Sequence, residues 1–243
     1  MNRRLMAAAL GFGLAALTLS AAPAADDISA PNDPAWVSLF DGKTLSGWKS
    51  MPMSKQESKW EVKDGVLEGS GGQSMLYSPR GDYQNFKFRA EVKINDKGNS
   101  GMYVRTPAEA TFMNGYEIQV NATHSDPIKT GSLYTLVHLM KSVTPPDTWF
   151  TQEIDVSDIN YRGKMVTKFR IFVNGELLYE YLDHDQLWKT GHFAFQQHDP
   201  GSKVSIRKVE VMELPPTKEA DGPRPAKVTP PAGGIGSKQA PKN

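Results

Sequence analysis

Alternating apolar and polar positions run through most of the chain and predict β-strands. The clearest segment covers residues 86–94, where Phe, Phe, Ala, Val and Ile alternate with Lys, Arg, Glu and Lys. A period of two places the apolar side chains on one face of a strand and the charged ones on the other. We therefore expect a half-buried strand whose outer face is solvated and rich in Lys and Glu.

Further strands are predicted wherever short apolar runs lie between turn signals. Asp64-Gly65 and Asn174-Gly175 are dipeptides typical of tight hairpin turns, and the first separates two short strands. The expected strands cover residues 60–63, 66–68, 98–105, 115–121, 131–138, 167–173, 191–197 and 203–212. Because no sustained helical periodicity interrupts them, the pattern favours an all-β fold, a two-sheet sandwich or jelly roll.

The two ends of the chain differ from its body. Asn2, Arg3 and Arg4 precede an uncharged apolar run over residues 5–19, and Ala22-Pro23-Ala24 supplies the small residues that a signal peptidase reads. We expect residues 1–24 to be a cleaved signal peptide, which predicts a periplasmic or secreted protein; an uncleaved membrane anchor is the alternative. The last segment is rich in Pro, Lys, Gly and Ala. The expected domains are therefore a signal peptide over residues 1–24, one β domain over residues 33–214 and a disordered tail over residues 215–243.

Composition argues against several classes of partner. The chain carries 28 Lys and Arg against 27 Asp and Glu, a formal net charge of +1. This balance gives no reason to expect nucleic acid or an anionic membrane as a partner. With no cysteine, the fold cannot depend on disulfide bonds. No group of residues has the close spacing of a known metal motif, and no cofactor is expected.

One set of strands carries a polar face that differs from an ordinary solvated face. If the strands on either side of residues 106–114 pair as a hairpin, Tyr103 lies opposite Glu117, and Arg105 is diagonal to Glu117. The face contains no lysine and is made of planar or amphipathic groups that suit sugar hydroxyls and sugar rings: Asn99, Tyr103, Arg105, Glu117, Gln119, Gln196 and His198. We interpret this face as a ligand-binding surface; an ordinary solvated face with a surface Arg–Glu pair is the alternative.

Several motifs, taken in order, carry a family resemblance. They are residues 36–48, Trp60, Asp64-Gly65, residues 83–86, Asn99-Ser100-Gly101, Arg105, residues 115–119 and residues 196–198. Their order and spacing resemble the 3-keto-disaccharide hydrolase family, formerly a domain of unknown function, over residues 36–214. The resemblance implies a two-sheet jelly roll of the concanavalin A-like lectin and glucanase type, with a concave ligand face. The chain departs from the family pattern at Trp149, which is followed by Phe150 where the family usually has Asn.

The resemblance also implies a reaction, the cleavage of a glycoside that is already oxidised at C3. The ketone acidifies the proton on C2, its removal gives an enolate that expels the C1 substituent, and later addition of water makes the net reaction a hydrolysis. Such a site needs a base, donors to the C3 oxygen and an acid for the leaving group. The predicted base is Glu117, the predicted enolate stabilisers are Arg105, Asn99 and Gln119, the predicted acid is His138 or His198, and the predicted sugar-binding residues include Tyr103, Gln196 and Tyr134. The partners implied are a small saccharide and an oxidoreductase that supplies the ketone.

Three alternatives stay open at this point. The same fold hosts non-catalytic carbohydrate-binding modules, so fold alone does not decide the function. The Glu153-Ile154-Asp155-Val156 segment resembles the catalytic strand of laminarinase-like glucanases, but Ser157-Asp158-Ile159 follows where a second catalytic Glu is needed. A metal held by Glu117, His138 and His198 is the weakest of the three.

Overall fold

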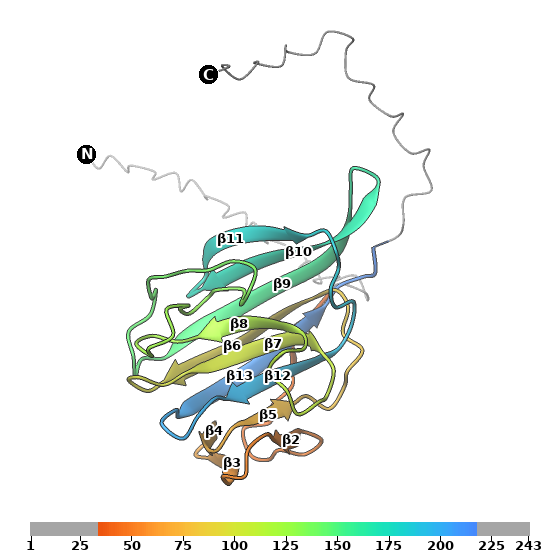
Figure 1. The fold of residues 1–243 in the computed structure, drawn as a ribbon. Helices are drawn as coiled ribbons and strands as arrows, with labels where there is room; N and C mark the ends of the chain where they lie inside the picture. Colours follow the sequence, from red (N-terminus) through yellow and green to blue (C-terminus); the bar gives the residue numbers. More distant parts are fainter. Residues whose placement is uncertain (1–33, 218–243) are drawn as a thin grey trace, which may run out of the picture. The chain divides into compact units, whose positions relative to one another are not determined.

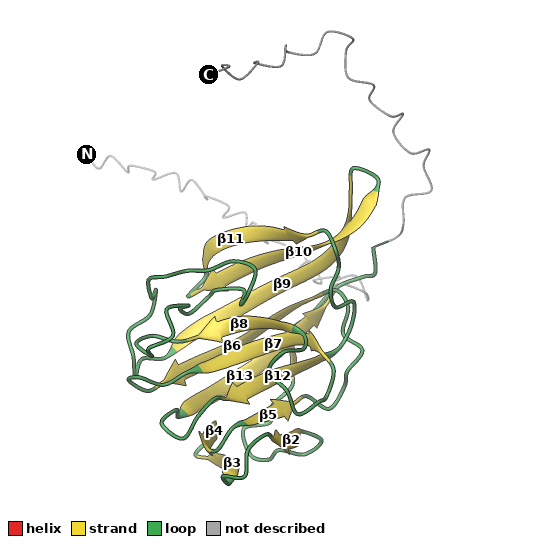
Figure 2. Cartoon of the chain, in the orientation of Figure 1, coloured by secondary structure: helices red, strands yellow, loops and turns green. Residues whose placement is uncertain are grey.

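The computed structural model describes residues 34–217, and every regular element among them is a strand (Figure 2). The strands are β1 Val37–Ser38, β2 Lys49–Pro52, β3 Ser58–Lys63, β4 Val66–Gly71, β5 Ser74–Tyr77, β6 Phe86–Ile94, β7 Ser100–Thr106, β8 Tyr116–Val120, β9 Phe150–Tyr161, β10 Lys164–Val173, β11 Glu176–Asp183, β12 His192–Gln197 and β13 Val204–Glu213. No helix long and apolar enough to span a membrane occurs in this part of the chain. The predicted signal peptide and most of the predicted tail lie outside the described residues.

Two antiparallel sheets form the sandwich (Figure 1). The larger sheet has eight strands in the order β11-β10-β9-β6-β13-β4-β3, with β1 also paired to β13. The smaller sheet has five strands in the order β2-β5-β12-β7-β8. The predicted all-β, two-sheet sandwich is therefore confirmed.

The core lies between the two sheets and follows the period-two pattern of the sequence. In β6 the apolar side chains are buried, whereas the Lys, Arg and Glu side chains between them are partly exposed. The ring of Phe88 on the larger sheet stacks on Phe193 of the smaller sheet, with centroids 4.0 Å apart. Burying each such side chain contributes about 1.5–3 kcal/mol, so the interdigitated aromatic rings are a main source of stability.

The hairpin of β7 and β8 has the predicted register. Tyr103 pairs with Glu117 and Gly101 pairs with Gln119. Ser100, Met102, Val104 and the apolar residues of β8 face the core, so the alternate side chains face away from it. The predicted polar face is therefore the outer face of the smaller sheet.

The predicted strand over residues 131–138 is wrong. The segment contains turns and two isolated bridges, in which Leu133 pairs with both Ile118 and Val137. The amide N–H groups of Leu136 and Val137 both donate to the Leu133 carbonyl, which closes a tight turn. Its apolar residues pack as a turn against the edge of the smaller sheet rather than extending it. Five strands that the pattern did not single out, β1, β2, β5, β9 and β11, complete the two sheets.

Candidate active site

A pocket lies on the outer face of the smaller sheet, between β7, β8 and β12 and the loops that follow β7 and β8. Its volume is about 230 Å³. The residues that line it are Asn99, Phe112, Met113, Gly115, Glu117, Gln119, Asp126, Tyr134, Thr135, Gln196 and His198. Neither lysine nor arginine occurs among these lining residues, so a ligand here meets amides, carboxyls, an imidazole and aromatic rings.

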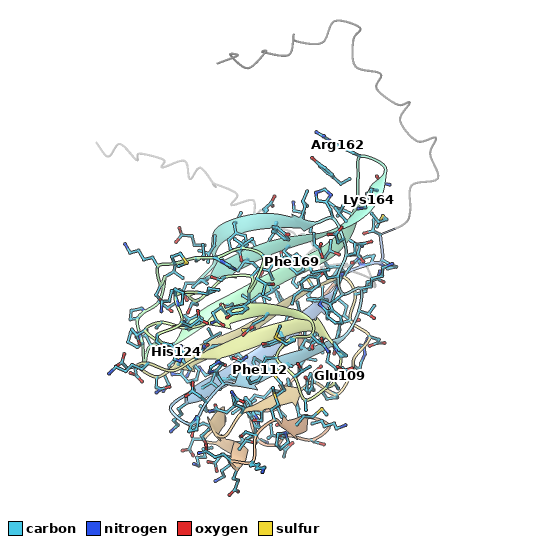
Figure 3. All side chains as sticks on the ribbon, in the orientation of Figure 1. Glu109, Phe112, His124, Arg162, Lys164 and Phe169 are labelled. Carbon is cyan, nitrogen blue, oxygen red and sulfur yellow. The ribbon has the colours of Figure 1, made fainter. Side chains whose placement is uncertain are left out.

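The loop between β7 and β8 forms one wall, and tyrosines of the sheet hold it in place. The hydroxyl of Tyr77 donates to the Glu109 carbonyl at 2.5 Å, and the hydroxyl of Tyr103 donates to the Phe112 carbonyl at 3.2 Å. Figure 3 shows Glu109 and Phe112 along this side of the molecule. Met113 on the same loop is 79% exposed, so the wall ends in an apolar side chain at the pocket mouth.

The loop after β8 forms the opposite wall and is held by its own polar side chains. The buried Asn121 amide donates to the carbonyls of Asp126 (3.0 Å) and Ile128 (2.8 Å). The Lys129 ammonium donates to the carbonyls of His124 (2.6 Å) and Asp126 (2.8 Å). These bonds satisfy backbone acceptors in a loop without regular structure, and they fix the positions of the loop's side chains beside the pocket.

Glu117 lies at the floor of the pocket, on β8. Its carboxyl lies over Gly101, where a modest side chain would collide with it: a Cβ at Gly101 would stand 2.3 Å from Glu117 Oε1. Burial raises the pKa of Glu117 to about 8; the Tyr103 hydroxyl opposes this change and the charge of Asp126 adds to it. A carboxyl in this environment is mostly protonated at neutral pH and within reach of ionisation.

Amide side chains surround Glu117. In the orientation that satisfies its hydrogen bonds, the Gln119 amide donates to Glu117 Oε1 and to the Ser100 carbonyl, both at 3.1 Å. Gln196 donates to the Tyr103 hydroxyl at 3.0 Å. The other amide atom of Gln196, Oε1, is buried and has no hydrogen-bond partner among the described residues. A buried acceptor without a partner suits a ligand hydroxyl that donates to it.

Tyr134 and Asp126 form a pair at the rim. The Tyr134 hydroxyl donates to Asp126 Oδ2 at 3.1 Å, and the Tyr134 amide N–H donates to the Glu117 carbonyl at 2.9 Å. Asp126 Oδ1 accepts the N–H of Ile128 at 2.8 Å. The carboxylate of Asp126 is thus anchored on both oxygens, and the turn that replaced the predicted strand brings Tyr134 to the pocket.

His198 follows β12 and lines the pocket. Its Nδ1 lies 2.8 Å from Asp199 Oδ2, and its ring stacks on Phe112 with centroids 5.8 Å apart. Burial opposes ionisation of Asp199, but hydrogen bonds from His198 and from the Gly201 N–H hold its pKa below the usual value. One ring nitrogen of His198, Nδ1, is therefore hydrogen-bonded to a carboxylate.

His124, His198 and Asp199 place potential metal-ligand atoms within 4.8 Å of one another. His124 (labelled in Figure 3) accepts the N–H of Asp126 at its Nδ1, 3.0 Å away. Because Nδ1 is an acceptor, the proton of the neutral ring is on Nε2, which faces Asp199 at 3.7 Å. In this tautomer Nε2 of His124 has no lone pair for a metal ion, and only His198 and Asp199 of the three are hydrogen-bonded to each other.

Arg105 is absent from the pocket, and its predicted pairing with Glu117 is wrong. The residue has a φ of 49°, and the register of β7 against β12 shifts between His192 and Ala194. This bulge reverses the direction of the side chain, because one extra residue interrupts the alternation. The guanidinium is fully buried and donates to Asp158 (3.0 Å) and Thr167 (3.1 Å) of the larger sheet.

His138 also lies away from the pocket. It follows the bridge residue Val137 and is not among the residues that line the cavity. Its predicted approach depended on a strand over residues 131–138, and the chain turns there instead. The other predicted residues, Asn99, Glu117, Gln119, Tyr134, Gln196 and His198, line one pocket, with Tyr103 buried beside Glu117.

The glucanase-like segment lies on the other side of the sandwich. Ile154 and Val156 of β9 are in the core, so Glu153 and Asp155 face outward from the larger sheet. Asp155 is flanked by Lys87 at 3.7 Å and Arg170 at 3.6 Å. These contacts are those of a charged outer face, and the segment contributes nothing to the pocket.

Sequence reasoning missed Phe112, Met113, Asp126, Thr135 and Asp199. All five lie in loops or at a strand end, where no period-two rule applies. A usable signal existed for Asp199, because a carboxylate directly follows the predicted His198. For the other four, only the folded loops bring them to the strands.

Comparisons with known proteins identify the family of the chain. The model of the family described as 3-keto-alpha-glucoside-1,2-lyase-like domain matches residues 35–212. A 3-keto-disaccharide hydrolase of Bacteroides thetaiotaomicron is 33% identical over 87 residues, which is 32% of this chain and 30% of that protein. The matched region thus spans less than a third of the length of this curated relative.

Two solved structures share the fold. One is a Parabacteroides distasonis protein described provisionally as a glycosyl hydrolase, with a TM-score of 0.58 and 20% identity over 74% of this chain and 100% of that chain. The other is a Bacillus subtilis protein of unknown function with a galectin-like fold, with a TM-score of 0.52 and 12% identity over 75% of this chain and 96% of that chain. At these identities the likeness concerns the fold alone.

Proposed function

The chain belongs to the 3-keto-alpha-glucoside-1,2-lyase-like family, and from this premise we propose that it cleaves the glycosidic bond of a 3-keto-glycoside or 3-keto-disaccharide. The observation that carries the proposal is Glu117, a buried and titratable carboxyl at the floor of a pocket lined by amides. A site that only binds sugar gains little from burying such a group without a cation. A site that transfers protons needs a group of this kind.

The pocket suits one sugar ring. Its volume of about 230 Å³ lies below the roughly 300–1,000 Å³ that is usual for drug-sized ligands. The unpartnered Oε1 of Gln196 and the carboxylate of Asp126 offer acceptors for hydroxyl groups. Phe112 and the exposed Met113 offer apolar surface at the mouth. We assign the oxidised ring to the polar floor and the leaving group to the mouth.

The reaction proceeds by elimination. Removal of the C2 proton gives an enolate whose negative charge is on the C3 oxygen. The enolate then expels the C1 substituent, and water adds across the new double bond to give net hydrolysis. Of the predicted enolate stabilisers, Asn99 lines the pocket and can donate to the C3 oxygen, whereas both N–H groups of the Gln119 amide are bonded to Glu117 and to the Ser100 carbonyl. With Arg105 committed to the interior, hydrogen bonds rather than a cation stabilise the enolate.

Glu117 takes part in proton transfer. Sequence reasoning assigned it the base role, and that role stays a prediction. With a pKa near 8, most of the free enzyme at pH 7 carries the protonated carboxyl, which is a proton donor. Either direction of transfer predicts that an amide at this position cannot replace the carboxyl.

The setting of the reaction is also a proposal. A cleaved signal peptide would bring the enzyme to the periplasm or the exterior of the cell. An oxidoreductase that dehydrogenates C3 of a glycoside has to act before it, because unoxidised sugars lack the acidic C2 proton.

The test is to incubate the wild type with a matched pair, a 3-keto-disaccharide and the same disaccharide unoxidised, and to measure released monosaccharide. We expect release from the oxidised member only. If the protein binds either sugar but cleaves neither, it is a carbohydrate-binding module. Release from the unoxidised member alone would instead indicate an ordinary glycosidase.

A further inference from the structure

Asp199 and His198 are linked in a way that gives the histidine a defined protonation pattern. Their side chains meet at 2.8 Å, between His198 Nδ1 and Asp199 Oδ2. The other oxygen, Asp199 Oδ1, accepts the N–H of Gly201 at 2.8 Å. The backbone N–H of Gly201 thus holds the Asp199 carboxylate in the position from which it orients the imidazole of His198.

The hydrogen bond determines which nitrogen of His198 is free. An ionised carboxylate only accepts hydrogen bonds, so Nδ1 of His198 is the donor and carries the proton. The lone pair of the neutral ring is then on Nε2, which has no hydrogen-bond partner among the described residues. Stacking on Phe112, at an interplanar angle of 14°, holds the ring plane while the ring borders the pocket.

We propose that His198, oriented by Asp199, removes the C2 proton of the oxidised sugar, and that Glu117 donates a proton to the leaving oxygen. Asp199 is a positioning residue, because it acts through His198. This inference rests on the proposed function and assigns the direction of each proton transfer. It reverses the roles that the sequence predicted for Glu117 and His198.

The assignment balances over a full cycle. His198 Nε2 takes the proton from C2, and the electron pair of the C–H bond forms the enolate with the C3 oxygen. The enolate returns to the ketone as a C1–C2 double bond forms and the C1–O bond breaks. The leaving oxygen takes the proton of Glu117. In the hydration step, Glu117 takes a proton from the water that adds to C1, and His198, whose proton has exchanged with solvent, protonates C2.

The protonation states of Glu117 and of Asp199, the partner of His198, agree with these directions of proton transfer. Burial raises the pKa of Glu117 to about 8, so it holds its proton at neutral pH. Burial opposes ionisation of Asp199, but the hydrogen bonds from His198 and Gly201 keep its pKa low, so it is ionised. Environments that separate the ionisation of neighbouring groups are how enzymes obtain an acid and a base in one site.

The experiment separates the two proton transfers. The first probe is a 3-keto C-glycoside, in which a methylene replaces the glycosidic oxygen, so that C2 can exchange with deuterium from D2O while elimination is blocked. The second is a 3-keto-glycoside with an alkyl leaving group. We expect H198Q to lose C2 exchange by at least about 100-fold. E117Q should keep exchange within about threefold of the wild type and lose release of the alkyl alcohol.

Asp199 is tested with the same probes. We expect D199N to slow exchange by about 10- to 100-fold, in the range usual for groups that orient a reacting side chain. Binding of the C-glycoside should change less than threefold, and D199E should restore part of the rate. D185N, in an exposed position outside the pocket, is the matched control and should exchange as the wild type does. A D199N variant that loses binding and exchange together would show a purely structural role.

Two outcomes would overturn the inference. One is normal exchange by H198Q with none by E117Q, which would make Glu117 the base. The other is loss of exchange on chelation with recovery on adding one divalent cation, which would replace the dyad by a metal site. If the wild type releases no alcohol from the alkyl 3-keto-glycoside, the proposed function fails, whatever the variants show.

Discussion

Arg105 and Glu117 lie on adjacent strands, both are buried, and their surroundings are opposite. The guanidinium of Arg105 donates to Asp158, to Thr167 and to the carbonyls of Gln84 and Trp188. Burial would raise the pKa of Asp158, yet the charge of Arg105 holds it below its usual value. Both members of this pair are therefore ionised and fully hydrogen-bonded.

Glu117 has no such partner. The described residues that line its pocket include no cation, and burial raises its pKa to about 8. Burial thus leaves Arg105 in a hydrogen-bonded ion pair with Asp158, whereas it leaves Glu117 with a pKa close to neutral pH. The difference between the two sites is whether an opposite charge is present, and it predicts that one supports folding and the other supports chemistry.

The sharpest separation comes from E117Q. The amide keeps the size of the side chain but cannot act as a general acid or base, so turnover of a 3-keto-glycoside should fall by about 10²–10⁴-fold. Ligand affinity should change much less, because the amide still bonds to hydroxyls. The measurement is kcat with the dissociation constant from calorimetry, and E176Q, at an exposed carboxyl on β11 outside the pocket, is the control. Normal turnover by E117Q would make the carboxyl a binding or structural group.

The opposite behaviour is expected of R105M. Removing the guanidinium leaves Asp158 buried without its cation, which costs about 3–5 kcal/mol of unfolding free energy. Urea titration of R105M beside R89M tests this, because Arg89 is half-exposed on the outer face and pairs with Glu210 at 2.8 Å. The control should lose no more than about 1 kcal/mol. An R105M protein that is stable but slow in turnover would return Arg105 to the reaction.

The pH dependence of stability provides a smaller effect. The folded-state pKa of Glu117 lies near 8 and the unfolded value near 4.5. Between these values the folded state keeps a proton that the unfolded state has released. The stabilisation associated with this proton is complete below pH 4.5 and is lost as the pH rises through 8, by at most about 1.4 kcal/mol per pH unit.

E117Q lacks this titration. The melting temperature of E117Q minus that of the wild type should therefore increase by several degrees between pH 5.5 and pH 8.5. Calorimetry of both proteins in matched buffers measures the difference. A constant difference across this range would show that Glu117 is ionised throughout, and the contrast with Arg105 would disappear.

The smallest effect is expected on the outer face of the larger sheet. E153Q and D155N change charges that face away from the pocket, so cleavage should stay within about twofold of the wild type. Loss of activity in variants that fold normally would make β9 the catalytic strand.

The alternation of β6, β7 and β8 predicted the fold and most of the candidate site, because strand side chains follow a rule that a sequence displays. The register that opposes Tyr103 to Glu117 follows from the same rule. The rule failed at Arg105, because a β-bulge there reverses the direction of the side chain. No residue type in the sequence indicates the position of this bulge.

The conformations of the loops were the other feature that the sequence pattern did not predict. Residues 131–138 have the apolar content of a strand, but their backbone bonds close a turn, which placed Tyr134 in the pocket and left His138 outside it. Asp126 and Phe112 reach the site only because side chains such as Asn121 and Tyr103 hold their loops. Such contacts depend on the assembled fold rather than on periodicity.

Bond cleavage is expected to pass through loss of the C2 proton. The most direct measurement is to let the wild type cleave a 3-keto-disaccharide in D2O and to determine deuterium at C2 of the released 3-keto sugar, with an enzyme-free sample of that sugar as the blank. Elimination followed by hydration predicts one deuterium at C2 for each bond cleaved. Cleavage without enzyme-dependent deuterium at C2 would show direct displacement at C1 and would contradict the elimination.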